Sequence, residues 1–178
     1  MPVERTAELT GIRSDAAIET FVAEHYDRLI GLARLVCGNG SDGADAVQVG
    51  LERAWRRRAT LRDDAGLRSW LDRIVIREAI RVSKRRQSWL GRLLTLSGNV
   101  AEIDVPDRRA SEPSTFVALR AALARLSPEQ RAVVALHLYQ GYTVAETASI
   151  VGVPEETVRS RLRLAKQRLR SELEESRS

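Results

Sequence analysis

Residues 141–170, GYTVAETASIVGVPEETVRSRLRLAKQRLR, contain the pattern that decides the fold. Thr143 and Glu146 stand at the spacing of a capping box, which begins a helix that should end near Gly152. Pro154 and the two glutamates after it begin a second, longer helix. The sequence therefore predicts two helices joined by a tight turn, which is helix-turn-helix geometry.

The longer helix combines an apolar stripe with a basic face. Its apolar residues recur every three or four positions, and the quoted stretch holds six arginines and lysines. The second helix of such a pair enters the DNA major groove N-terminus first, so base-reading residues should cluster near 155–163. The stripe is Val158, Leu162, Ala165, Leu169 and Leu173; the predicted DNA-binding residues are Glu155, Thr157, Arg159, Ser160, Arg161, Arg163 and Lys166, with Lys166, Arg168 and Arg170 suited to phosphates.

The charge of the chain is unevenly distributed. Of its 29 basic residues 27 are arginine, which binds phosphates and guanine edges through two parallel hydrogen bonds. Residues 52–92 carry a net charge of +8 and residues 115–178 one of +3, whereas residues 93–114 carry −2. Two basic segments separated by an acidic one indicate two contacts with a polyanion.

Apolar periodicity divides the chain into segments. Leu, Ala, Arg and Glu dominate, and helical spacing recurs over 17–37, 41–58, 67–86 and again from residue 115. Within 67–86 the expected inner face includes one mismatch, Glu78. We therefore predict an all-α protein of two small helical domains joined by a flexible linker. The expected segments are a disordered tail at 1–14, a domain at 15–88, a linker at 89–114, in which 89–96 could form a short helix, and a domain at 115–178.

Several functional classes find no support in the sequence. There is no Gly-rich phosphate loop and no nucleophile paired with a base, so we expect no enzyme and no catalytic residue. His25 and His137 lack a second ligand at metal spacing, so we expect no metal and no cofactor. Cys37 is the only cysteine, which favours a reducing compartment. The start, MPVERTAELTGIRSDAA, lacks an apolar signal segment, so a cytoplasmic location without membrane contact is expected.

The string LARLSPEQRAVVALHLYQGYTVAETASIVGVPEETVRSRLRLAKQRLRSEL (123–173) resembles the C-terminal DNA-binding domain of extracytoplasmic-function (ECF) sigma factors, in the sigma-70 family. The matching motifs include Leu126-Ser127-Pro128, Gly152-Val153-Pro154 and the run Thr157–Leu162. The resemblance implies that the basic helix binds the minus-thirty-five element of promoters. Thr147 stands where the family usually has Ile, and Glu156 where it usually has Gly.

The N-terminal half resembles domain two of the same family, and the resemblance covers about residues 18–175. DGADAVQVGLERAW (42–55) is similar to the helix that binds the polymerase clamp, although Val49 stands at the usual Glu. LRSWLDRIVIREAIRVSKRR (67–86) is similar to the strand-opening helix, although Arg77 stands at the usual Asn. The implied polymerase-binding residues are Asp45, Gln48, Val49 and Glu52; the implied minus-ten and melting residues are Arg62, Asp63, Trp70, Arg73, Arg77, Arg81, Lys84 and Arg85.

A sigma factor directs RNA polymerase to the promoter sequence and helps to open the DNA duplex. The partners that the resemblance implies are core RNA polymerase, through its β′ clamp and β flap, promoter DNA and an anti-sigma factor. A flexible linker of 26 residues spans about 28 Å on average, whereas two DNA sites one and a half to two turns apart are about 50–70 Å apart. We therefore expect the free chain to bind promoters poorly until polymerase holds its two domains apart.

Two other functions remain open on the sequence alone. A stand-alone helix-turn-helix regulator would use the C-terminal half, usually as a dimer on paired half-sites, but would leave 45–55 without a role. An RNA-binding or adaptor protein would use the basic helices nonspecifically, but the aromatic platforms expected for it are missing. For Trp70, packing in the core is the alternative to a role in strand opening.

Overall fold

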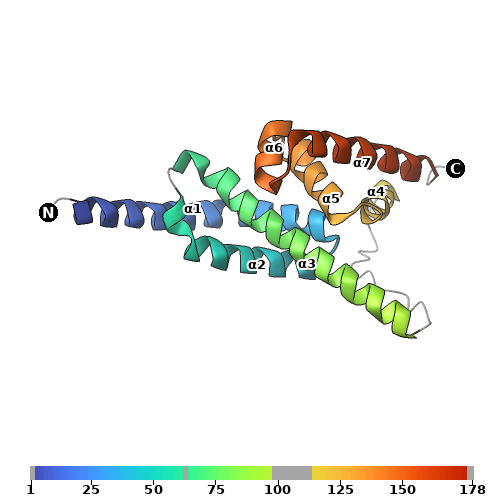
Figure 1. The fold of residues 1–178 in the computed structure, drawn as a ribbon, viewed down its shortest axis with the longest axis horizontal. Coiled ribbons are helices and arrows are strands. Elements are labelled where there is room, and N and C mark those ends of the chain that lie inside the picture. Colours follow the sequence, from blue (N-terminus) through green and yellow to red (C-terminus); the bar gives the residue numbers. More distant parts are fainter. Residues whose placement is uncertain (1–2, 62–63, 98–113, 176–178) are drawn as a thin grey trace.

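The computed structural model describes residues 3–61, 64–97 and 114–175 of the chain, and every regular element in these ranges is helical (Figure 1). This confirms the predicted all-α class. The N-terminal module comprises α1 (Val3–Cys37), α2 (Gly40–Arg56), short 3-10 turns at Arg58–Thr60 (η1) and Asp64–Gly66 (η2), and α3 (Leu67–Ser97). The C-terminal module comprises α4 (Ser114–Ala124), α5 (Pro128–Val134), a π-helical turn at Ala135–Tyr139 (η3), α6 (Val144–Val151) and α7 (Glu155–Glu175).

Two helices extend beyond the bounds that periodicity predicts. Helix α1 begins at Val3, so residues 3–14, expected as a disordered tail, continue the helix. This segment holds helix-favouring Glu, Arg, Ala and Leu, and a helix that is packed further along extends into such sequence at small cost. Helix α3 continues to Ser97, through the first part of the predicted linker. Residues 98–113 of that linker lie outside the described residues.

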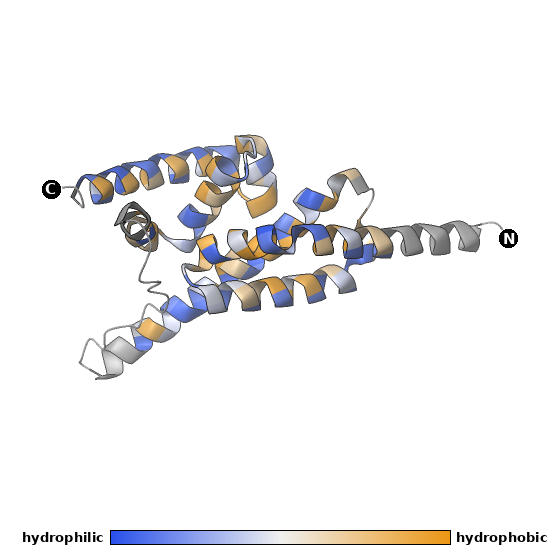
Figure 2. Ribbon diagram, turned by 180° about the vertical axis from the view of Figure 1, so that it is seen from behind, coloured by the Kyte–Doolittle hydropathy of each residue, from blue (hydrophilic) through white to orange (hydrophobic). Residues whose placement is uncertain are grey.

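The three helices of the N-terminal module pack around one apolar seam. Leu29, Val47 and Val75 are fully buried, one from each helix. Hydrophobic and hydrophilic residues alternate along each helix in Figure 2, as amphipathic helices require. Helices α1 and α2 approach closely at Gly43, where an added Cβ would lie 2.9 Å from the backbone nitrogen of Arg34. Only glycine fits this crossing.

A few residues of the predicted apolar stripes are exposed. Tyr26 keeps 44% of its surface in solvent, and Trp55 keeps 40%. The guanidinium of Arg58 lies 4.8 Å from the ring centroid of Trp55, so a cation covers this ring in place of the core. Leu138 and Tyr139, at the π-helical turn, are also exposed. A change in backbone winding rotates these two side chains away from the stripe that an α-helical period predicts.

The C-terminal module lies directly against α1 and α3 (Figure 1). Leu136 and Ile150 belong to the same buried cluster as Val36 and Ala79, so the two modules share one apolar core. The start of α1 and the end of α7 lie at opposite ends of the long axis of the molecule (Figure 1). The sequence predicts the two modules but not the contact between them. Among the described residues, no helix combines the length and apolarity needed to cross a bilayer.

Candidate nucleic-acid interface

Helix α6 has the predicted cap at each end. The Thr143 hydroxyl accepts a hydrogen bond from the backbone N–H of Glu146 at 3.2 Å, and the Glu146 carboxylate accepts one from the backbone N–H of Thr143 at 2.8 Å. The hydrogen bonds that its carboxylate accepts from the backbone N–H and then the hydroxyl of Thr143 hold the pKa of Glu146 below its ordinary value. The helix ends at Gly152, whose φ of +77° favours glycine over every residue with a side chain. The turn then places Pro154 at the start of α7, which completes a helix-turn-helix.

Helix α7 is held by its apolar stripe. Val158, Leu162 and Ala165 are buried, and the helix contacts α4, α5 and α6. Leu169 and Leu173 are only half-buried, so the predicted stripe is fully covered over its first half alone. The N-terminal half of α7 is therefore rigidly placed, which a base-reading helix requires.

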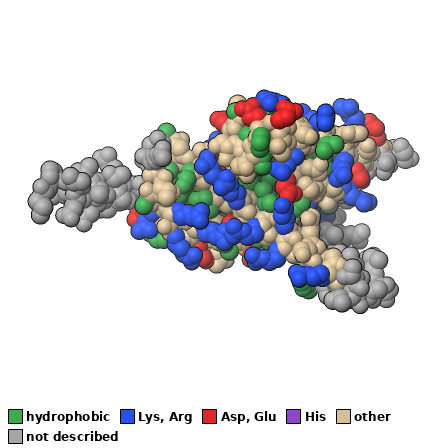
Figure 3. Space-filling view, in the orientation of Figure 1, with side chains coloured by type: hydrophobic (Ala, Val, Ile, Leu, Met, Phe, Trp, Pro, Cys, Tyr) green, Lys and Arg blue, Asp and Glu red, His purple; other side chains and the backbone are tan. Residues whose placement is uncertain are grey.

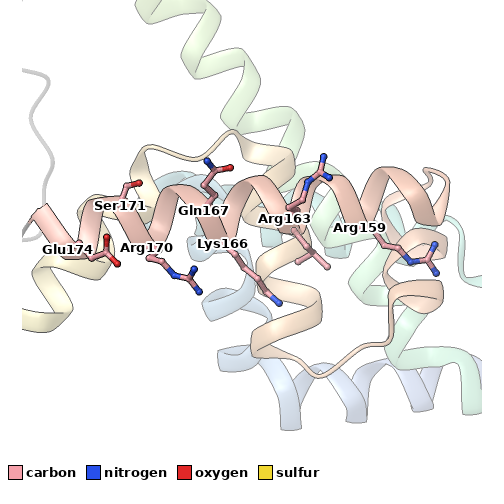
Figure 4. Close-up of a pocket in the computed structure, with 8 residues that line it drawn as sticks. Arg159, Arg163, Lys166, Gln167, Arg170, Ser171 and Glu174 are labelled. Carbon is pink, nitrogen blue, oxygen red and sulfur yellow. The ribbon is translucent and has the colours of Figure 1, made fainter.

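The side of α7 next to this stripe is basic and open to solvent. A groove of about 570 Å³ runs along it, and its lining includes Arg159, Arg163, Lys166 and Arg170. In Figure 4 the side chains of Arg159, Lys166 and Arg170 project to one side of the helix, and Arg163 projects to the other. The predicted residues Glu155, Arg159, Arg163 and Lys166 are exposed, and Thr157, Ser160 and Arg161 are half-buried.

Arg159 is paired within its own helix. Its guanidinium donates to the Glu155 carboxylate at 2.7 Å and approaches the Glu156 carboxylate at 3.5 Å. Such exposed pairs contribute little free energy, so a guanine edge or a phosphate can replace the carboxylates. The two glutamates thus orient the Arg159 side chain without preventing it from binding DNA.

Arg168 differs from the other basic residues of α7. Its guanidinium donates to the backbone oxygen of Arg125, just after α4, at 3.4 Å. It lines a separate groove with Leu164 and Arg125. The structure therefore places Arg168 beside α4 and away from the groove of Arg159, contrary to its grouping with Lys166 and Arg170.

A second group of predicted DNA-binding residues lies on α3. Figure 3 shows Lys and Arg side chains gathered over α2 and α3. Trp70 is half-buried against the apolar cluster of Leu61, Leu67 and Leu71, and its indole N–H donates to the Thr60 hydroxyl at 3.3 Å. These contacts give Trp70 a packing role. Arg62 and Asp63 lie outside the described residues.

Three of the α3 cations face the C-terminal module. The guanidinium of Arg73 donates to the Ser149 hydroxyl at 3.0 Å. A Cβ added to Gly152 would lie 2.6 Å from Nη2 of Arg77, so this guanidinium rests on the helix-turn-helix turn. Lys84 pairs with Glu129. Of the remaining predicted residues, Arg85 is exposed, and Arg81 approaches the Glu78 carboxylate at 3.5 Å.

The predicted polymerase-binding residues share the outward face of α2. Asp45, Gln48 and Glu52 are exposed and Val49 is half-buried. On the opposite face Val47 is fully buried against α1 and α3. The four residues therefore lie on an accessible surface that the core does not use.

Sequence reasoning misses the buried polar residues between the modules. Asp72 is fully buried and Arg131 keeps 5% of its surface exposed. Asp72 stands three positions before the buried Val75 and four before the buried Ile76. This helical spacing is the signal that could have revealed the burial of Asp72. Arg131 likewise stands four positions before the buried Ala135. Among the described residues, His, Cys, Asp and Glu nowhere gather in a group of three that could hold a metal ion.

Comparison with known families matches both halves of the chain. Residues 21–90 match the family described as Sigma-70 region 2, and residues 116–169 match Sigma-70, region 4. The chain is 35% identical over 153 residues to ECF RNA polymerase sigma factor SigM of Mycobacterium tuberculosis, covering 86% of this chain and 75% of that protein. It is 30% identical over 159 residues to the RNA polymerase sigma-E factor of Streptomyces coelicolor, covering 87% and 85%.

Two solved structures have the same fold. The sigma factor RpoE of Bartonella quintana, in complex with the anti-sigma factor NepR, matches with a TM-score of 0.69 and 24% identity, over 88% of this chain and 96% of that chain. CnrH, in complex with the cytosolic domain of CnrY, matches with a TM-score of 0.65 and 22% identity, over 94% of each chain.

Proposed function

The chain belongs to the ECF sigma factors of the sigma-70 family, and from this premise we propose which of its surfaces carry each step of transcription initiation. As a sigma factor of this type it directs core RNA polymerase to promoters and aids the melting of DNA. The single observation that carries the assignment of promoter DNA to the C-terminal module is the rigidly seated α7, whose basic face is open to solvent.

We assign the minus-thirty-five element to α7. Glu155, Thr157 and Arg159 lie in its first two turns, the end that a helix-turn-helix presents to base edges. Arg163 and Lys166 follow along the same groove and are suited to phosphates. The two kinds of contact have different consequences, because base contacts set sequence preference and phosphate contacts set affinity and its salt dependence.

We assign the minus-ten element and the separated strand to the basic residues of α3. Arg73, Arg77, Arg81, Lys84 and Arg85 occur at spacings of one to four residues, so they can follow a phosphate backbone along the helix. Arg62 and Asp63 belong to the same proposal through the family resemblance. The hydrogen bond and the apolar contacts of Trp70 favour its role as a support for this helix.

We assign the β′ clamp of polymerase to the outward face of α2. Asp45, Gln48, Val49 and Glu52 lie there, and removing an exposed side chain from such a surface leaves the core intact. The C-terminal module is the proposed partner of the β flap. We further propose an anti-sigma factor as inhibitor, because RpoE was co-crystallised with the anti-sigma factor NepR, and CnrH was likewise solved in complex with another protein, the cytosolic domain of CnrY.

The proposal includes no catalytic step for this chain. Core polymerase catalyses RNA synthesis, and the sigma factor places it on the promoter, so we propose a non-enzymatic role. We propose that this role is carried out in the cytoplasm, where polymerase and promoter DNA meet. A stand-alone regulator is not favoured, because residues 21–90 match the polymerase-binding half of the family.

Run-off transcription tests the proposal directly. Purified protein and core polymerase are incubated with fragmented genomic DNA, and the 5′ ends of the transcripts are sequenced. We expect starts at a limited set of sites that share two sequence elements upstream. Starts that do not depend on the added protein would reject the function. A Lys166→Ala variant should keep the same start sites but yield less transcript. That result would show that Lys166 contributes to affinity for DNA and not to sequence preference.

A further inference from the structure

One acidic residue stands on the basic face of α7. Glu156, Arg159, Lys166 and Arg170 follow one another at spacings of three, seven and four residues, which return to the same face of an α-helix. All four are exposed, and Figure 4 shows the side chains of the three cations on one side of the helix. Glu156 comes first, at the end of α7 that a helix-turn-helix presents to the major groove. This row therefore begins with a carboxylate and continues with cations.

Glu156 is the less engaged of the two carboxylates beside Arg159. Nη2 of Arg159 donates to the Glu155 carboxylate at 2.7 Å, whereas Nη1 lies 3.5 Å from that of Glu156. The Glu156 side chain keeps 84% of its surface exposed, against 46% for Glu155. Glu155 is therefore sufficient to orient Arg159, and the carboxylate of Glu156 is available to another hydrogen-bond donor.

A carboxylate on this face opposes the binding of DNA. It lowers the positive potential that the phosphates meet, so phosphate contacts alone would be stronger without Glu156. If it enters the groove next to base acceptors, it also loses water without gaining a partner, which is costly for a charged group. Glu156 can therefore favour binding only where the DNA offers its carboxylate a hydrogen-bond donor.

The major groove offers a carboxylate only two kinds of donor. These are the exocyclic amino groups of cytosine, N4, and of adenine, N6. Adenine places its N7 acceptor beside N6, so the second oxygen of a carboxylate would face another acceptor there. Cytosine has no acceptor beside N4 on its own major-groove edge, and glutamate accordingly pairs with cytosine, whereas asparagine and glutamine pair with adenine. The chemistry of Glu156 therefore selects cytosine.

The spacing of Glu156 and Arg159 suits neighbouring base pairs. Residues three positions apart are separated by about 4.5 Å along a helix, and successive base pairs by about 3.4 Å along the duplex. On DNA, Arg159 exchanges its carboxylates for O6 and N7 of a guanine, and Glu156 exchanges Arg159 for N4 of a cytosine in the next pair. Where that cytosine is absent, the released carboxylate of Glu156 is left without a partner.

We propose that Glu156 determines promoter specificity: its carboxylate accepts a hydrogen bond from N4 of a cytosine, in the base pair next to the one that Arg159 recognises. The proposal rests on the proposed function, because it takes α7 as the helix that binds the minus-thirty-five element. Glu156 acts mainly by exclusion, since any other base at that position leaves its carboxylate unpaired. It lowers the affinity for DNA in general and increases the difference between promoters.

Transcription by the assembled holoenzyme from a promoter library tests the proposal. The library starts from a promoter found by run-off transcription, and each position of its minus-thirty-five element is varied to all four bases. Transcripts are counted by sequencing for the wild type, Glu156→Ala, Glu156→Gln and Arg159→Ala. Glu174→Ala removes an exposed carboxylate near the other end of α7 and controls for the loss of one negative charge.

We expect the wild type to prefer cytosine about tenfold at one position, next to the position whose preference Arg159→Ala relaxes. Glu156→Ala should abolish the cytosine preference and raise transcription from the other three bases, and Glu174→Ala should leave the preference unchanged. Glu156→Gln should move the preference toward adenine, because an amide both donates and accepts. The cytosine preference should persist in Arg159→Ala, since a separate side chain recognises that base.

Two results would overturn the role of Glu156. One is a base preference in Glu156→Ala that equals that of the wild type at every position. The other is a change confined to the position that Arg159→Ala also relaxes, which would mean that Glu156 only orients Arg159. In both cases transcription that depends on the added wild-type protein leaves the proposed function in place. If no start depends on the wild-type protein, the proposed function fails, and the role of Glu156 fails with it.

Discussion

The carboxylate of Glu78 on α3 pairs with the guanidinium of Arg53 on α2, at a position where the helical pattern requires an apolar residue. Glu78 is 4% exposed, and Arg81 approaches the same carboxylate at 3.5 Å. Burial, and then the positive charge of Arg81, lower the pKa of Arg53. The glutamate thus neutralises a crowded group of arginines and joins two helices.

Removal of this carboxylate should destabilise the fold. We expect Glu78→Ala to lower the free energy of unfolding by about 1–3 kcal/mol, because the arginines beside it lose their buried partner. Urea denaturation measures the change. Glu52→Ala, which removes a surface pair with Arg56, is the control and should change it by less than about 0.5 kcal/mol. Equal effects of the two variants would contradict the structural role of Glu78.

Two threonines of the helix-turn-helix should respond to the same substitution with opposite sign. Thr147 is fully buried, and its hydroxyl has no partner among the described residues. Thr147→Val should therefore stabilise the protein by about 1 kcal/mol, because an unpaired buried hydroxyl is costly. Thr143→Val removes the cap of α6 and should destabilise it by about 1 kcal/mol. Thermal unfolding of both variants measures this, and a loss of stability in Thr147→Val would show that its hydroxyl is satisfied.

Arg159 and Lys166 should differ in how they affect DNA binding. Arg159→Ala should cost about 1–3 kcal/mol at one base pair of the minus-thirty-five element and relax the preference there. Lys166→Ala should weaken all promoters alike and lower the dependence of affinity on salt by about one unit of slope. Transcription from a reporter library with every base varied in turn measures both effects. An unchanged base preference in Arg159→Ala would reject its assignment as a base reader.

The outward face of α2 should bind polymerase without contributing to folding. Asp45→Ala and Gln48→Ala should weaken assembly with core polymerase and leave the melting temperature nearly unchanged, because both side chains are exposed. Val47→Ala, on the buried face, should instead destabilise the fold by about 1–3 kcal/mol. Native gel electrophoresis of the mixture with core polymerase measures assembly. Normal assembly of both surface variants would show that the clamp binds another surface of the chain.

The ion pair of Lys84 and Glu129 should make the contact between modules sensitive to acid. Burial raises the pKa of Glu129, but hydrogen bonds from Lys84 and the backbone outweigh burial, so the net pKa is lowered. A carboxyl whose pKa is lower in the folded state stabilises above its unfolded pKa, and this contribution is lost as pH falls.

The stability difference between wild type and Glu129→Gln should thus be present at pH 7 and be lost progressively as the pH falls below about 4, through the lowered pKa of the folded state. Its size should be about 1 kcal/mol or less, because Lys84 is largely exposed. Urea denaturation between pH 3 and pH 7 measures it, with the exposed Glu24→Gln as the control for loss of one negative charge. A difference that grows as pH falls would contradict the pairing.

The parts of the molecule that sequence predicts are those that local chemistry determines. The caps of α6 and the start of α7 follow from residues within four positions of each other, so they are predictable. The contact between modules depends on residues far apart in the chain, such as Arg131 and Val36, and no local pattern links them. Helix α3 continues past residue 88 because its sequence suits a helix, although the apolar period weakens there.

The placement of Cys37 has a practical consequence. Its thiol is buried at the end of α1 and lies 3.5 Å from the backbone oxygen of Ala79, and burial raises its pKa to about 12. Since thiolates are the reactive species, alkylating reagents should modify this sulfur only in molecules whose core has transiently opened. The rate at which the Cys37 thiol is alkylated would therefore report how often the folded core opens, and no engineered probe is needed.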